Sequence, residues 1–89
     1  SGEIAHKMGE IMQNMSETMQ VICITHLPQI AAKGKTHYKV YKDESSHQTS
    51  THINLLSQEQ RIEEIAEMLS GKNPSQAARQ NAIELLGKS

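Results

Sequence analysis

Apolar residues recur every three or four positions from the N-terminus, which is the spacing of one helix face. They are Ile4, Met8, Ile11, Met12, Met15 and Met19. This pattern predicts an amphipathic helix over residues 3–18, with the stripe in a core or an interface. Gly9 weakens such a helix, but it permits a neighbouring element to approach closely.

A continuous apolar run, Val21-Ile22-Cys23-Ile24, follows this helix. Apolar residues without alternation are typical of a strand buried on both faces, as in a parallel sheet covered by helices. We therefore predict a buried strand over residues 20–25. The other predicted elements are too few to cover such a strand, so the run indicates that its neighbouring strands are missing from these 89 residues.

A short helix and a hairpin are predicted next. Residues 26–34 read as a loop and a short helix, with Pro28 in the first turn and Gly34 just past the end. Residues 35–56 alternate in polarity around a polar loop, which predicts a β-hairpin.

Two helices are predicted in residues 57–89. Ser57 and Gln60 fit a capping box, and Asn73 and Pro74 fit the N-cap and first position of the last helix. The resulting order, α-β-α-β-β-α-α, indicates the α/β class.

Composition argues against several classes of protein, among them disulfide-stabilised and membrane-spanning proteins. The apolar content of 36%, without Trp or Phe, is thin for a chain of 89 residues. A net charge of −1 gives no strong overall attraction to nucleic acid or to anionic lipid. The single Cys23 excludes an internal disulfide and suits a reducing compartment, and no apolar run is long enough for a membrane helix. We predict a cytoplasmic protein without a membrane partner.

His26 is the main candidate for chemistry, because it follows the predicted strand directly. Ligands of open α/β sheets bind at the carboxyl ends of the strands. A histidine there can donate a hydrogen bond to a phosphate oxygen or position a water. The alternative is a histidine that only bonds a nearby backbone carbonyl, and position alone leaves both open.

Residues 20–32, QVICITHLPQIAA, resemble the switch-histidine region of the RecN family, which are SMC-like ABC ATPases. The resemblance extends over nearly the whole chain and implies the C-terminal fragment of a P-loop ATPase head. It implies that His26 senses the γ-phosphate and supports hydrolysis, with Thr25 and Gln29 shaping the loop. Ser1 and Gly2 resemble the end of the family's D-loop, near the dimer interface.

The resemblance also implies a function in DNA double-strand break repair and recombination. ATP and Mg²⁺ would bind between two heads of a homodimer. The remainder of the polypeptide would supply the Walker A, Walker B and signature motifs, and DNA would bind the assembled protein.

None of these three motifs occurs in the chain, so we expect the isolated segment to bind no ATP and to hydrolyse none. Gly34-Lys35-Thr36 ends like a Walker A loop, but Gln29 occupies the position of the leading glycine. It also precedes a predicted strand, whereas a P-loop opens a helix.

Other groups have simpler interpretations. His37, His47 and His52 match no zinc spacing and are predicted to be surface histidines, and Cys23 is predicted to be inert packing. Four lysines either protect an exposed strand edge or contact DNA phosphates: Lys33, Lys35, Lys39 and Lys42. The rival function is therefore a small dimeric or weakly DNA-binding module without catalysis.

Overall fold

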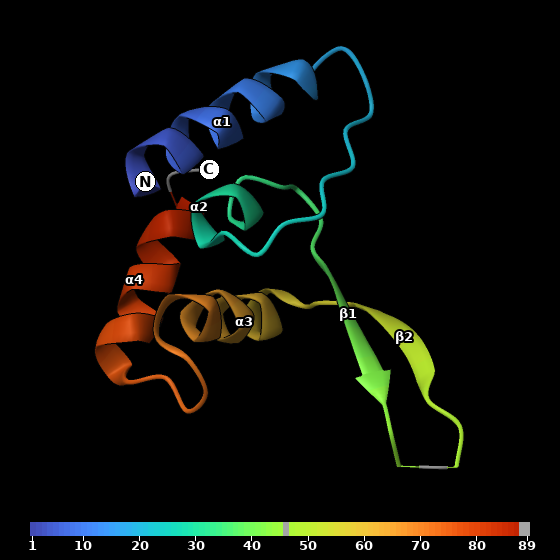
Figure 1. The fold of residues 1–89 in the computed structure, drawn as a ribbon. Coiled ribbons are helices and arrows are strands. Elements are labelled where there is room, and N and C mark those ends of the chain that lie inside the picture. Colours follow the sequence, from blue (N-terminus) through green and yellow to red (C-terminus); the bar gives the residue numbers. More distant parts are fainter. Residues whose placement is uncertain (46, 88–89) are drawn as a thin grey trace.

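The structure is a computed structural model that describes residues 1–45 and 47–87. Within these residues it combines helices with one two-stranded antiparallel sheet (Figure 1). The elements are α1 Gly2–Met15, α2 Pro28–Ala31, β1 Tyr38–Asp43, β2 Ser50–Leu55, α3 Gln58–Ser70 and α4 Gln76–Gly87. This mixed composition is compatible with the predicted α/β fragment.

The core lies where α2, α3 and α4 meet. Its buried members are Ala32, Ile65, Ala66, Ala78 and Ala82. Ile65 is 0% exposed, and the four alanines around it let the helix backbones approach closely. One side of each of the two C-terminal helices is therefore buried in this core.

Local signals fix both ends of α3. The Ser57 hydroxyl accepts a hydrogen bond from the Gln60 amide at 3.2 Å, and the Gln60 side chain accepts one from the Ser57 amide at 2.9 Å. Gly71 ends the helix with a φ of 91°, which a residue with a Cβ rarely adopts. The predicted capping box is confirmed.

The predicted start of α4 is wrong by two residues. Ser75 caps the helix, because its hydroxyl accepts a hydrogen bond from the Ala78 amide at 3.1 Å. Asn73 instead has a φ of 56° and turns the chain between the two helices. Pro74 is buried in this turn rather than at the first helical position.

The N-terminal helix α1 packs on α2 through small residues. Ala5 and Gly9 are its buried positions. A Cβ built on Gly9 would lie 2.9 Å from Lys33 Cγ and 3.2 Å from the Gln29 carbonyl oxygen. The close approach predicted at Gly9 is therefore confirmed.

The Ile and Met stripe of α1 is not part of the core of this chain. Its exposed members are Ile4, Met8, Ile11 and Met15. The small-residue face of the helix is buried instead, so the stripe is left as a continuous apolar surface.

The predicted buried strand over residues 20–25 is not formed. The segment runs irregularly between α1 and α2 (Figure 1), with Ile22 83% and Ile24 99% exposed. A strand buried on both faces needs neighbouring strands for its backbone groups. In the described part of the chain the only strands are β1 and β2, and they pair with each other. Cys23 is consequently exposed, so the prediction of inert packing is wrong.

The predicted hairpin forms and projects from the helices (Figure 1). Its register pairs Tyr38 with Leu55 and Val40 with Ile53. Alternation places these four side chains on one face, where all are exposed. On the opposite face, Lys39 reaches α3.

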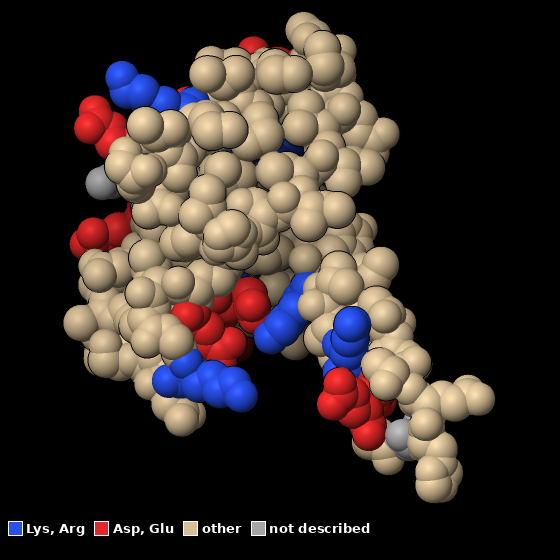
Figure 2. All heavy atoms as spheres, viewed as in Figure 1, with Lys and Arg blue, Asp and Glu red and all other residues tan. Residues whose placement is uncertain are grey.

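The face of the molecule in Figure 2 has no large area of a single charge sign. On the face shown in Figure 2, acidic and basic side chains are interspersed, and much of the surface is uncharged. No described helix is long and apolar enough to cross a membrane.

The contact at Gly9 predicts that Gly9→Val destabilises the chain. The added side chain meets a backbone carbonyl and the middle of a buried lysine, so α1 must move away from α2. We expect a loss of about 1–2 kcal/mol and a fall in Tm of roughly 5–15 °C, measured by circular dichroism. Gly87→Val is the control, because nothing lies within 4 Å of a Cβ there. Equal Tm values for the two variants would contradict this packing.

Candidate functional site

His26 lies at a bend directly before α2, and its side chain is exposed. It contributes no packing to the core, which is built around Ile65. The interpretation of His26 as a histidine bound to a backbone carbonyl gains no support, since no such bond is among the hydrogen bonds of this loop. The imidazole is therefore accessible to a ligand.

The loop that carries His26 is held by hydrogen bonds of its two neighbours in sequence, Thr25 and Leu27. The Thr25 hydroxyl accepts a hydrogen bond from the Leu27 amide at 3.0 Å, which closes a turn across His26. The Leu27 carbonyl then accepts from the Ile30 and Ala31 amides at 3.1 and 3.0 Å. The Thr25 hydroxyl thus joins the loop to the residue that precedes α2.

The other predicted site residues lie at the junction of α1 with α2. The Ser1 hydroxyl caps α1 by accepting from the Ile4 amide at 3.4 Å. The Gln29 side-chain nitrogen lies 3.2 Å from where a Cβ on Gly2 would be. The structure therefore brings Gly2 and Gln29 together.

Sequence reasoning missed Arg61, which joins α3 to the end of α2. Its Nη2 donates to the Ala31 carbonyl at 3.1 Å, to the Ala32 carbonyl at 3.3 Å, and also to the Gly34 carbonyl. Burial lowers the pKa of this guanidinium, which is only 9% exposed. The sequence signal was a cation four residues before Ile65, on the buried face of the same helix.

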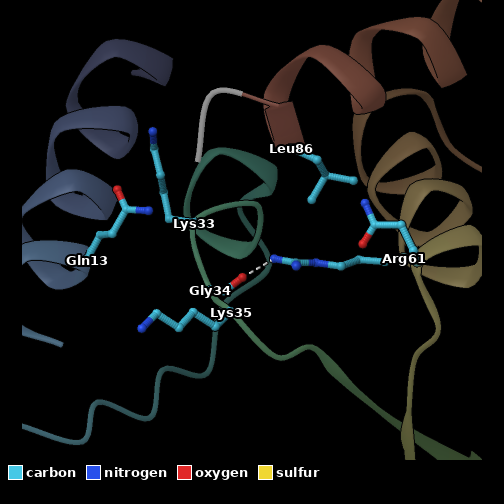
Figure 3. Close-up of a pocket in the computed structure, with 7 residues that line it drawn as sticks. Gln13, Lys33, Gly34, Lys35, Arg61 and Leu86 are labelled. Atoms are coloured by element: carbon cyan, nitrogen blue, oxygen red, sulfur yellow. Dashed lines mark hydrogen bonds between the residues drawn. The ribbon is translucent and has the colours of Figure 1, made fainter. Parts of the chain in front are cut away.

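Arg61 lines a cavity of about 290 Å³. Figure 3 shows its side chain crossing to the Gly34 carbonyl, while Lys33 and Lys35 extend away from it. The guanidinium thus meets carbonyl oxygens rather than the open cavity.

Gly34-Lys35-Thr36 lies between α2 and β1, with no helix starting after it. The Gly34 carbonyl, rather than its amide, faces a charged partner. This geometry differs from a phosphate-binding loop, in which amides at a helix N-terminus face the ligand.

The four lysines do not form one exposed row. Lys33 is buried, and its stem packs against Gly9. Lys39 Nζ lies 2.7 Å from a Glu64 carboxylate oxygen, and this hydrogen bond raises the pKa of Lys39. Lys35 and Lys42 are exposed.

The hairpin histidines differ in their environments. His52 stacks on Tyr41, with ring centroids 5.4 Å apart. Ser50 Oγ and Asp43 Oδ2 lie 3.0 and 3.9 Å from the same nitrogen, His52 Nε2, so the three residues cannot relay a proton as a catalytic triad does. Across residues 1–45 and 47–87, no three His, Cys, Asp or Glu side chains lie close enough to hold a metal ion.

His37 is not the surface histidine that was predicted. It is half-buried, and its Nδ1 is buried without a hydrogen-bond partner among the described residues. It follows the loop that Arg61 holds, and its ring is near enough to Arg61 and Glu64 to feel their charges.

Comparison with known proteins identifies the family. The chain is 46% identical over 85 residues to the DNA repair protein RecN of Deinococcus radiodurans, and 42% identical over 86 residues to that of Rickettsia conorii. It is 46% identical over 85 residues to RecN of Xylella fastidiosa. These matches cover 96–97% of the chain. This stretch of sequence belongs to the RecN family.

The match is consistent with a C-terminal RecN segment, as the sequence predicted. No family model matches the chain. The chain spans only about 15–16% of the length of these RecN relatives. Most of a RecN protein therefore lies outside the structure.

In this RecN segment, the partial burial of His37 predicts that the free energy of unfolding decreases in mild acid. Burial, and then the nearby Arg61 cation, lower the pKa of His37 below its ordinary value of 6.5, although Glu64 acts in the opposite direction. The unfolded chain therefore takes up the proton first as pH falls, so stability is lost from about pH 6.5 down to the folded pKa.

The measurement is the Tm of the wild type and of His37→Gln between about pH 7.5 and 5.5. We expect the decrease in Tm to be smaller in His37→Gln. His47→Gln, at an exposed loop position, is the control and should keep the wild-type slope. The same slope in all three proteins would contradict a buried neutral His37.

Proposed function

We propose that this chain is the C-terminal part of a RecN-like ATPase acting in DNA repair, including double-strand break repair and recombination, and that His26 is its contact with the γ-phosphate of ATP. One observation carries the proposal. An exposed imidazole stands on a hydrogen-bonded loop, directly after an apolar segment that has no sheet partner among residues 1–45 and 47–87. The relatives that match nearly the whole chain are DNA repair proteins by name.

The apolar segment explains how the histidine would reach a nucleotide. Val21–Ile24 has the composition of a central strand, and completing a sheet would remove Ile22 and Ile24 from water. His26 would then stand at the carboxyl end of that strand, where ligands of open sheets bind. From there the imidazole could donate a hydrogen bond to a γ-phosphate oxygen or orient the attacking water.

Mg²⁺ would neutralise the charge that develops on the phosphates, but the region of His26 does not fit it. Residues 20–33 contain no Asp or Glu, and the Thr25 hydroxyl is engaged with the Leu27 amide. We therefore assign the metal ligands, with the Walker A and Walker B motifs, to the remainder of the polypeptide and derive no step through them.

The remainder of the polypeptide is also the partner best suited to the exposed apolar surfaces. Three apolar surfaces are exposed: the stripe of α1, residues 21–24 and one face of the hairpin. Together they expose more apolar area than scattered single surface residues would. A second subunit would complete the nucleotide site with its signature motif, near Ser1 and Gly2. DNA would bind the assembled protein.

The direct test is His26→Ala in the full-length protein that contains this segment. We expect the kcat for ATP to fall by about 10²-fold, with a smaller change in KM, because the contact strengthens as charge develops. His47→Ala is the matched control, since this histidine lies on the hairpin loop. ATP turnover by His26→Ala equal to that of the control would remove the assignment.

A second test concerns the isolated chain. Without a phosphate-binding loop it should show no saturable binding up to about 1 mM ATP by calorimetry. The full-length protein is the positive control in the same buffer. Saturable micromolar binding by the isolated chain would show that it holds a nucleotide site of its own.

A further inference from the structure

Arg61 anchors the C-terminal end of α2 to the core. The last carbonyls of any helix lack partners within the helix, and they carry partial negative charge. Arg61 Nη2 meets the carbonyls of Ala31, the last residue of α2, of Ala32, its C-cap, and of Gly34 in the loop that follows. Arg61 lies one turn before Ile65, so the anchor is fixed to the best buried part of α3.

This anchor is continuous with the loop of His26. Arg61 donates to the Ala31 carbonyl, and the Ala31 amide donates to the Leu27 carbonyl at 3.0 Å. The Leu27 amide donates to the Thr25 hydroxyl at 3.0 Å. His26 lies between the last two residues of this series, so any shift of α2 moves the imidazole.

A helix of four residues cannot hold this position by itself, because it makes too few internal bonds to be stable alone. On the side opposite Arg61, α1 only limits how far α2 can move, through the close contact at Gly9. Arg61 adds charged hydrogen bonds at the end of α2, beside the burial of Ala32 in the core.

We infer that Arg61 is a positioning residue for His26: it fixes α2, and thereby the imidazole, at the distance that the nucleotide requires. This inference rests on the proposed function of His26. It assigns Arg61 no contact with substrate, since its guanidinium is directed at backbone carbonyls.

The test uses the full-length protein and a double-mutant cycle. Arg61→Lys keeps the charge, but its side chain ends one atom short of Nη2, the single nitrogen that meets all three carbonyls. We expect kcat to fall by about tenfold with KM for ATP changed by less than about twofold, since a displaced catalytic group costs rate rather than binding. In a His26→Ala background, Arg61→Lys should cause no further fall.

Arg79→Lys is the matched control. Arg79 also joins two helices, through hydrogen bonds of 2.8 and 2.9 Å to the Glu63 carboxylate, but it makes them at the outer side of α3 and α4. This variant should keep wild-type turnover. Amide hydrogen exchange gives a second measurement, in which Ile30 and Ala31 should exchange faster in Arg61→Lys and at the wild-type rate in Arg79→Lys.

The possible outcomes distinguish the function of His26 from the positioning role of Arg61. If Arg61→Lys lowers kcat equally with and without His26, or leaves both kcat and the exchange of α2 unchanged, the positioning role is wrong while the function of His26 stands. If His26→Ala itself keeps full turnover, the proposed function fails and the positioning role fails with it. A loss in Arg61→Lys that depends on His26, together with faster exchange in α2, supports the inference.

Discussion

The buried guanidinium of Arg61 joins α3 to the end of α2, which in turn packs against α1. The α2 helix has four residues, yet it lies between α1 and the pair formed by α3 and α4. Arg61 satisfies the carbonyls at its C-terminal end, and Pro28 supplies the fixed backbone angle at its start. Burial of an arginine is costly unless its donors are used. Here Nη2 meets three carbonyl oxygens, whereas the buried Nε has no hydrogen-bond partner among the described residues. The placement of α1 and of the loop with His26 both follow from this interaction.

The remaining surface is that of an incomplete domain. The core around Ile65 is small, and large apolar side chains are left outside it on α1, on the 20–25 segment and on one face of the hairpin. Each has the periodicity of an element that packs on one or two neighbours. Burial of such surface is worth about 25 cal/mol per Å², so a cover supplied by the rest of a RecN protein would stabilise all three. The short length of the chain relative to its relatives agrees with this interpretation.

Local signals in the sequence predicted local structure well. Ser57, Gln60 and Gly71 fixed the ends of α3 because caps act within one helical turn. Asn73 misled because Ser75, two residues on, competes for the same amides and wins. The predictions that failed concern segments whose structure depends on distant parts of the chain. Val21–Ile24 specifies a sheet interior that only other strands can build, and the stripe of α1 does not reveal that Ala5 and Gly9 form the buried face.

In the candidate site, too, local features could be predicted from the sequence and contacts between distant residues could not. The sequence pointed to His26 through its place after an apolar run and through the family resemblance, and the structure adds the bracing by Thr25 and Arg61. A local pattern marks Arg61 as a cation on the buried face of α3, but its partners lie 27–30 residues away and could not be read from that pattern. The most direct measurement of the account is a structure of the full-length protein with a non-hydrolysable ATP analogue. It should place a His26 ring nitrogen within about 3 Å of a γ-phosphate oxygen, with residues 20–25 paired between neighbouring strands. An imidazole directed away from the nucleotide, with that segment still unpaired, would contradict it.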